Sequence, residues 1–263
     1  MGRKPARVIE KERARRAAGA ATVWLFGLHA VRDALTNPAR VRCSLLVTRN
    51  AADRLSEAIA ASGMAPRIVE PRDFDAPLDA QSVHQGAALE VLPLDWGSVS
   101  EVCAPRGGAP RVLLLDRVSD PHTVGAVLRS AEVFGARAVI APQRHSAPET
   151  GALAKSASGA LERQPYLRVP NLARAIGTLR DMGYTVLGLD GAAETELGEG
   201  LRDFAEFPVA LALGAEGPGL RDLTAKLCDR RLRIPSGGSF GSLNVSNAAA
   251  VALYAARPSG RPA

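Results

Sequence analysis

The chain has 263 residues, enough for two compact domains or one large one, and its 46% hydrophobic share allows a sizeable core. Its net charge of +6 favours a nucleic-acid partner, but residues 1–22 hold seven basic and two acidic side chains, so +5 of this charge lies there and +1 in the other 241 residues. No apolar run reaches the roughly 18 residues of a membrane span. The three cysteines form no CxxC pair, which predicts a reduced, cytoplasmic protein.

The first 22 residues are charged and alanine-rich and show no apolar face, so they predict a basic flexible arm. Such an arm either contacts phosphate groups or is a solvated tail without a special role. From Trp24 onward the pattern changes, and Val31, Ala34 and Leu35 lie on one face of a helix that ends at Asn37-Pro38.

Strands and helices alternate over residues 23–98, which predicts a small α/β domain. The predicted strands cover residues 43–48, 67–70 and 86–94, and a helix over 51–63 ends at Gly63. Residues 99–110 are polar and rich in proline and glycine, which is typical of a linker.

Residues 111–258 form the second predicted domain. Its apolar runs are continuous instead of alternating, so they predict buried strands of a mostly parallel sheet in an α/β fold. The predicted strands are 111–116, 136–142, 184–190, 209–214 and 230–235, and the predicted helices are 124–135, 171–182, 219–227 and 242–256.

Three segments that follow these strands carry unusual residues, at the sheet edge where ligands of parallel folds bind. They read DPHTVGAVLR (120–129), LGAEGPGL (213–220) and IPSGGSFGSLNVSNA (234–248). Glycines in the second segment let backbone amides approach a ligand because no Cβ intervenes. The third feeds a helix start, where free N–H groups suit capping or an anionic ligand.

Each segment by itself also has an ordinary structural interpretation. Arg129 could be a salt-bridged surface arginine, residues 213–220 a simple turn, and Ser242 to Asn244 a plain N-cap. No GxGxxG follows a strand and no GxxxxGK[ST] is present, which argues against an NAD enzyme and a P-loop NTPase. Histidines and cysteines are too scattered for a metal site.

Together and in this order, the three segments resemble the SpoU (TrmH) branch of the SPOUT methyltransferases. The family patterns are DP-x-N-x-GA-x-x-R, LG-x-E-x-x-GL and IP-x-x-G-x-x-x-SLNVS-x-A, and each is matched in turn. Upstream, FGLHAVRDAL and HQGAALEV are similar to the family's accessory RNA-binding domain. The resemblance covers nearly everything from residue 24 onward and is strongest to the ribosomal-RNA guanosine 2′-O-methyltransferases.

The resemblance implies a carboxy-terminal domain with a deep trefoil knot that binds S-adenosylmethionine, an active site shared across a homodimer, and an amino-terminal domain that binds RNA. It implies that the catalytic residues are Arg129, Glu216, Ser242 and Asn244, and we expect Glu216, at a neighbouring strand end, to be the partner that orients Arg129. It implies that the cofactor-binding residues are Gly214, Gly219, Ile234 and Leu243.

One position departs from the family pattern, because Thr123 stands where asparagine is usual. Threonine keeps a hydroxyl but loses the amide's paired donor and acceptor, which bears on ribose positioning. The predicted function is S-adenosylmethionine-dependent methylation of a ribose 2′-hydroxyl in large-subunit ribosomal RNA. The alternatives are the same reaction on transfer RNA, and a knotted RNA-binding protein without activity.

Overall fold

The computed structural model of the protein describes residues 22–79, 82–106, 108–238 and 243–257. The chain divides into two compact units, Met1–Asp95 with Glu149–Gly151, and Trp96–Pro148 with Ala152–Ala263. The predicted basic arm lies outside the described residues except for Thr22. Within the described ranges, no helix is long and apolar enough to cross a membrane.

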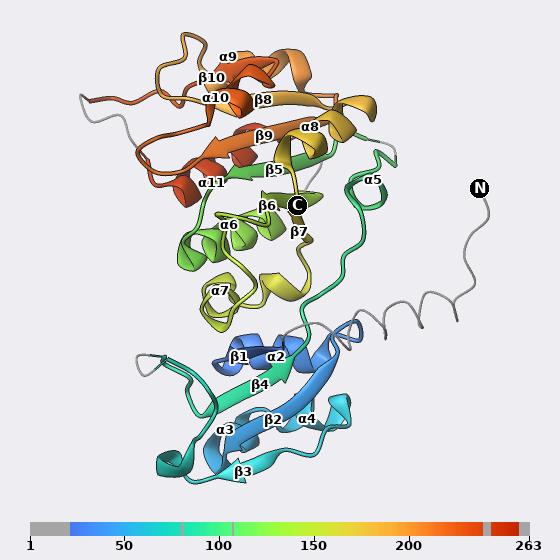
Figure 1. The fold of residues 1–263 in the computed structure, drawn as a ribbon, viewed down its shortest axis with the longest axis vertical. Coiled ribbons are helices and arrows are strands. Elements are labelled where there is room, and N and C mark those ends of the chain that lie inside the picture. The colour runs from blue at the N-terminus through green and yellow to red at the C-terminus, as the bar shows by residue number, and fades with distance from the viewer. Residues whose placement is uncertain (1–21, 80–81, 107, 239–242, 258–263) are drawn as a thin grey trace, which may run out of the picture. The chain divides into compact units, whose positions relative to one another are not determined.

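The first unit is built on a four-stranded mixed sheet in the order β1-β4-β2-β3 (Figure 1). Strand β4 runs antiparallel to both β1 and β2, and β2 runs parallel to β3. Its elements are β1 (Val23–Phe26), α2 (Leu28–Thr36), β2 (Arg42–Thr48), α3 (Arg49–Arg54), α4 (Ser56–Ser62), β3 (Arg67–Val69), the 3-10 turn η1 (Pro71–Asp73) and β4 (Ala87–Val91).

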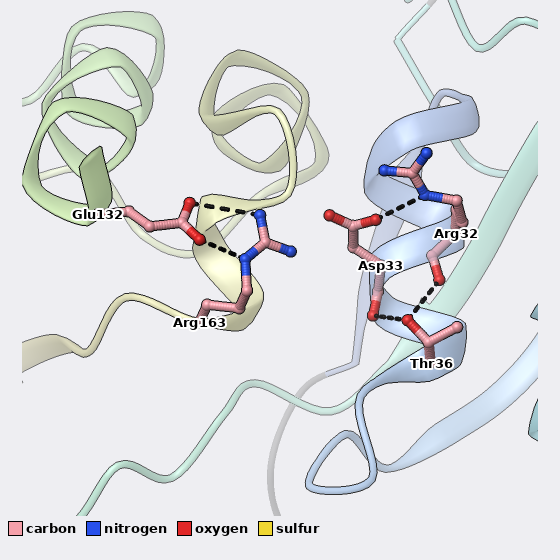
Figure 2. Close-up of polar contacts among 5 residues, drawn as sticks. All are labelled: Arg32, Asp33, Thr36, Glu132 and Arg163. Carbon is pink, nitrogen blue, oxygen red and sulfur yellow. Dashed lines mark hydrogen bonds and ion pairs between the residues drawn. The ribbon is translucent and has the colours of Figure 1, made fainter. Parts of the chain in front are cut away.

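Helix α2 confirms the helix predicted before Asn37-Pro38. Val31 and Leu35 on its apolar face are fully buried. In its last turn, Thr36 Oγ1 donates to the carbonyls of Arg32 and Asp33 at 3.2 and 3.1 Å, and Arg32 Nε donates to Asp33 Oδ1 at 2.8 Å (Figure 2). The Thr36 hydroxyl therefore supplies a donor to two carbonyls at the helix end.

Two details of the first unit differ from the prediction. Strand β1 was not predicted, because its four residues lead directly into the pattern of α2. The single helix predicted over 51–63 is wrong, because Leu55 interrupts it with φ −106° and ψ 7° and separates α3 from α4. The predicted end at Gly63 is confirmed, and this glycine adopts the left-handed conformation with φ 68°.

The second unit is a six-stranded, entirely parallel sheet in the order β10-β8-β9-β5-β6-β7 (Figure 1). Its strands are β5 (Arg111–Asp116), β6 (Ala138–Pro142), β7 (Tyr166–Val169), β8 (Thr185–Leu189), β9 (Val209–Gly214) and β10 (Arg230–Leu232). Its helices are α5 (Val99–Val102), α6 (Pro121–Val133), α8 (Leu172–Asp181), α9 (Leu197–Gly200), α10 (Asp222–Lys226) and α11 (Val245–Ala255). The second unit also contains the 3-10 turns η2 (Ala160–Glu162) and η3 (Arg202–Phe204). Helix α7 (Gly151–Ala157) starts at Gly151, which is assigned to the first unit, and its other residues belong to the second unit.

Helices cover both faces of this sheet, as expected for buried parallel strands. Val112 and Leu114 of β5 belong to one core cluster with Ile176 and Leu179 of α8. Successive side chains of a strand point to opposite faces, so Leu113 faces the other side, where α6 and α11 pack. The predicted mostly parallel α/β fold is confirmed, including the limits of β5 and β9.

The buried Arg111 joins three segments at the amino end of β5. Its guanidinium donates to the carbonyls of Ala205, Phe207 and Ala256 at 2.8, 2.7 and 2.5 Å. Burial lowers the pKa of this guanidinium. Because Ala256 ends α11 beside the start of β5, α11 begins near the opposite edge of the sheet.

Residues 99–110, predicted as a linker, contain the short helix α5. It begins with a capping box, in which Ser98 Oγ accepts from the Glu101 amide at 3.3 Å and Glu101 accepts from the Ser98 amide at 2.9 Å. The turn packs on the core through the buried Cys103, whose carbonyl accepts from the Tyr184 hydroxyl at 2.7 Å. This polar stretch of sequence therefore contains a helical turn that packs on the core.

Candidate active site

The site is built at the carboxyl edge of the parallel sheet, the edge where β5, β6 and β9 end. β5 ends at Asp116 directly opposite Gly214 of β9, and β6 ends at Pro142. The sequence segment 120–129 begins four residues after Asp116, and the segment 213–220 continues from the end of β9 at Gly214. The crevice beyond such strand ends is where parallel α/β folds place ligands.

The loop after Gly214 folds back on the end of its own strand. The Gly219 amide donates to the Ala215 carbonyl at 2.9 Å, and these two residues form an isolated bridge. A Cβ added to Gly214 would lie 1.9 Å from the Gly219 carbonyl carbon and 2.2 Å from the Leu220 nitrogen. Gly217 and Gly219 adopt φ values of 83° and 68°, which side chains disfavour. The backbone of this loop therefore requires glycine.

Asp116 secures the far end of the glycine loop. Its carboxylate, with a side chain 0% exposed, accepts from the Arg221 amide at 3.0 Å and from Arg221 Nε at 2.6 Å. A buried carboxylate is costly without such donors, so the pairing fixes where the loop ends. Asp116 was not singled out in the sequence, although a carboxylate that ends a wholly apolar strand is the signal that marks it.

Glu216 and Asn244 are brought together from the second and third segments. Asn244 Nδ2 donates to Glu216 Oε1 in a short hydrogen bond. Asn244 is also the N-cap of α11, since its Oδ1 accepts from the Ser246 amide at 2.8 Å and from the Ser246 hydroxyl at 2.6 Å. The cap turns the amide nitrogen toward Glu216, and both side chains stay exposed to a ligand.

Among the predicted cofactor residues, Gly214 and Gly219 lie on either side of Glu216 in the glycine loop, Leu243 directly precedes Asn244, and Ile234 follows β10. Gly214 and Ile234 are half-buried, whereas Gly219 and Leu243 are exposed. Ser242, predicted as catalytic, lies outside the described residues.

Thr123 takes part in capping the first turn of α6. Its hydroxyl and its amide donate to Asp120 Oδ2 at 2.6 and 2.7 Å, and the His122 amide donates to Oδ1 at 3.2 Å. These hydrogen bonds, the Thr123 hydroxyl above all, lower the pKa of Asp120. The residue that departs from the family pattern therefore has its hydroxyl in a helix cap.

Arg129 is exposed on α6 and does not join Glu216, the partner expected from the sequence. Glu216 bonds Asn244 instead, and the nearer carboxylate, Glu132, accepts two hydrogen bonds from Arg163 (Figure 2). Within the part of the chain that the structure describes, the Arg129 side chain has no hydrogen-bond or ion-pair partner. Nine residues of helix separate it from the Asp120 cap, a distance of roughly 13 Å at 1.5 Å per residue.

Gly125, one turn before Arg129, serves helix packing. A Cβ there would lie 2.6 Å from Ser156 Cβ and 2.7 Å from the Leu153 carbonyl oxygen, so the glycine lets α7 approach α6 closely. Ser156 Oγ also donates to the His122 carbonyl at 2.8 Å. Helix α7, which carries Ser156, ends at Ala157.

The described residues at this edge include neither a metal cluster nor an activated thiol. Among the described residues, no group of three or more His, Cys, Asp or Glu side chains is arranged to hold a metal ion. Burial raises the pKa of Cys103 to about 12 and that of Cys228 to about 11. Both thiols are therefore protonated near neutral pH and poor nucleophiles.

A parallel α/β domain with a folded-back glycine loop and a capped helix start at one edge belongs to the class of α/β proteins that bind a ligand beyond the carboxyl ends of their strands. The model of the SpoU rRNA Methylase family matches residues 110–254. The chain belongs to this family.

Two curated proteins illustrate the similarity. The 23S rRNA (guanosine-2′-O-)-methyltransferase RlmB of Pseudomonas putida is 39% identical over 239 residues, which cover 88% of this chain and 94% of that protein. An uncharacterized tRNA/rRNA methyltransferase of Synechocystis is 41% identical over 174 residues. The match covers 65% of this chain and 44% of that protein's length.

A solved structure shares the fold along most of the chain. The SpoU methyltransferase AviRb from Streptomyces viridochromogenes, solved in complex with AdoMet, matches with a TM-score of 0.76 at 24% identity and covers 92% of this chain and 91% of that one. The family resemblance inferred from the three motifs is confirmed.

Proposed function

We propose that this protein transfers a methyl group from S-adenosylmethionine to the 2′-hydroxyl of a guanosine ribose in large-subunit ribosomal RNA. The observation that carries the proposal is the Asn244–Glu216 hydrogen bond, which joins two sequence motifs beside the glycine loop. The relative from Pseudomonas putida, matched along 88% of this chain, supports ribosomal RNA as the substrate.

The residues at the carboxyl edge fit the methyl donor. The half-buried Gly214 packs its backbone directly against that of Gly219, which shapes the glycine loop, and Gly214, Gly219, Ile234 and Leu243 would supply the backbone contacts. When bound, S-adenosylmethionine supplies an electrophilic methyl group on a sulfonium. The site therefore has to hold the ribose in line with that methyl and lower the barrier to losing the hydroxyl proton.

The side chains of Asn244, Glu216 and Arg129 carry out these two tasks. Asn244, held by its cap and by Glu216, presents polar atoms beside the glycine loop and orients the ribose. Glu216 keeps that amide in place and adds negative charge beside the sulfonium. Arg129 holds the ribose phosphate and favours the deprotonated oxygen, and the proton leaves to a phosphate oxygen or solvent, since a guanidinium stays charged.

We further propose that the site is completed across a homodimer. Arg129 lies roughly 13 Å along α6 from its cap, away from Asn244 of the same chain, so a second copy has to supply it. Three exposed apolar residues on the two packed helices α6 and α11 support such an interface: Val133 (69% exposed), Val251 (41%) and Tyr254 (56%).

The same proposal includes the trefoil knot and the roles of the other segments. Strand β10 lies at the border of the sheet beside β8, whereas α11, the next helix in the chain, packs against β9 and α6. This arrangement supports a knotted crossing. The first unit and the basic arm (residues 1–22) would bind RNA, in a cytoplasmic enzyme.

The function is tested with unmodified ribosomal and transfer RNA incubated separately with labelled S-adenosylmethionine. We expect label in 23S ribosomal RNA, at a guanosine ribose that mapping of ribose-methylated positions identifies. Label confined to transfer RNA would contradict the substrate. Absence of label from both, with RNA binding intact, would indicate the non-catalytic RNA-binding protein.

The dimer is tested with the double variant Val133→Asp/Val251→Asp, which places two carboxylates in the exposed apolar patch. Desolvating them at an interface is costly, so the mass from multi-angle light scattering should halve. The control is Leu223→Asp on α10, where a leucine 60% exposed lies away from α6 and α11. A double variant with unchanged mass, or a monomeric wild type, argues against this interface.

A further inference from the structure

The carboxyl edge carries three exposed basic side chains that the assigned site does not use. Arg117 follows β5, and Arg144 and His145 lie in the loop after β6. The two loops are neighbours, because β5 pairs with β6 and the Ala147 amide donates to the Val118 carbonyl at 3.3 Å. We name Arg117, Arg144 and His145 the basic edge.

The loop after β6 is held by hydrogen bonds to β7, and it is joined to the loop after β5 through Ala147 and Val118. The Gln143 amide donates to the Val169 carbonyl at 2.8 Å, and the buried Tyr166 hydroxyl donates to the Ala147 carbonyl at 2.8 Å. Arg168 Nη2 donates to the Gln143 carbonyl at 2.5 Å. The basic edge thus projects from fixed loops, so its contacts cost little ordering.

The backbone itself is unusual at two of the three basic residues. Arg117 has φ 64° and His145 has φ 61°, in the left-handed region that residues with a Cβ seldom adopt. Such conformations cost free energy, and they cluster where a protein needs a side chain at a set place.

Nearby carboxylates are already engaged. Asp116 pairs with Arg221, and Asp120 caps α6. The Arg117, Arg144 and His145 side chains have no hydrogen-bond or ion-pair partner within the described ranges. Several exposed arginines elsewhere in this unit do have them, as Arg163 with Glu132 (Figure 2), although Arg129 does not within the described residues. Further paired examples are Arg180 with Asp229, Arg230 with Asp203, Arg231 with Asp190 and Arg233 with Glu196.

Arg117 and Arg144 therefore keep a positive charge without a carboxylate partner among the described residues, and Arg117 directly follows Asp116, the strand partner of Gly214. A guanidinium on each of the two neighbouring loops can bind the oxygens of a phosphate group. We propose that Arg117 and Arg144, with His145 as an additional donor, bind the RNA backbone next to the target nucleotide. This inference rests on the proposed function, since it concerns the surface through which the same site binds its RNA substrate.

The test measures RNA binding separately from methylation. The variants are Arg117→Asn, chosen because asparagine tolerates the left-handed conformation, Arg144→Ala and the double variant. The matched control is Arg202→Ala. Arg202 is an exposed arginine of η3 and lies three residues before Ala205, whose carbonyl accepts from Arg111 at the opposite edge of the sheet. The probe is transcribed, unmodified 23S ribosomal RNA, and its affinity is measured over a series of salt concentrations.

We expect each single variant to bind the RNA about fivefold more weakly and the double variant about 25-fold, with a salt slope lower by roughly one per lost phosphate contact. S-adenosylmethionine affinity and the single-turnover rate at saturating RNA should stay at the wild-type values. Arg202→Ala should bind like the wild type.

A double variant with wild-type affinity and salt slope would overturn the proposal, and so would an equal loss in Arg202→Ala. A wild type that binds RNA without methylating it refutes the proposed function but leaves this surface testable by affinity. A wild type that binds no RNA refutes both.

Discussion

Gly214→Ala should weaken S-adenosylmethionine binding by about 100-fold or more, since overpacking costs a few kcal/mol when backbone must move. The new Cβ would lie 1.9 Å from the Gly219 carbonyl carbon, 2.1 Å from its oxygen and 2.2 Å from the Leu220 nitrogen. All three atoms are backbone, so no side-chain rotation relieves the clash, and the loop must open. Calorimetric titration with S-adenosylmethionine measures the loss.

The matched control is Gly237→Ala in the third segment. A Cβ there meets nothing within 4 Å and the residue has no positive φ, so affinity should be retained. Gly219→Ala should give an intermediate loss of roughly tenfold, because left-handed backbone costs about 1–2 kcal/mol with a Cβ. Circular dichroism and melting curves separate loop opening from unfolding. Wild-type affinity in a folded Gly214→Ala protein would show that this loop does not hold the cofactor.

Arg129→Ala should lower the single-turnover methylation rate by about 100-fold or more, as expected for a lost electrostatic or acid–base group. Cofactor affinity should change little, since the cofactor contacts proposed above are backbone groups of other segments. Arg129→Lys should not restore the rate, because an ammonium cannot reproduce the planar fork of donors. Within the described residues this side chain makes no ion pair, so the melting temperature should also stay close to that of the wild type.

The same variant tests whether the site is shared between two copies. In a mixture of Arg129→Ala and Asn244→Ala proteins, a mixed dimer has one site with both defects and one with neither. After random exchange, half the dimers are mixed, so activity should return to about a quarter of the wild type. No recovery after proven exchange would place Arg129 and Asn244 of one chain in one site. A near wild-type rate in Arg129→Ala alone would remove the residue from catalysis.

Strands buried on both faces were the most predictable part of the fold. The limits of β5 and β9 agree with the predicted 111–116 and 209–214, because a continuous apolar run between polar residues has clear ends. Strand β7 was missed, since its four residues include the charged Arg168 and show no such run. Helix α5 was missed because its capping box lies in a stretch dominated by proline and glycine.

The sequence predicted which residues belong to the candidate site better than it predicted the contacts between them. Glu216 and Asn244 were expected in one catalytic group and do meet. Arg129 was expected beside Glu216, and this was wrong for a single chain, because α6 carries it away from the carboxyl edge. Asp116 was overlooked, since only the fold reveals that a strand-ending carboxylate receives two hydrogen bonds from Arg221.

The sequence by itself determined the family, the parallel α/β domain and the glycines of the ligand loop, because these depend on residue types at fixed spacing. Only the tertiary structure decided which charged and polar groups pair. Asp116 meets Arg221 across 105 residues, Glu132 meets Arg163 across 31, and Glu216 meets Asn244 across 28. Local periodicity carries no information on such pairs, because strand order and helix packing set them. The pairing also decides which cations have no carboxylate partner among the described residues, and Arg117, Arg129 and Arg144 are three of them.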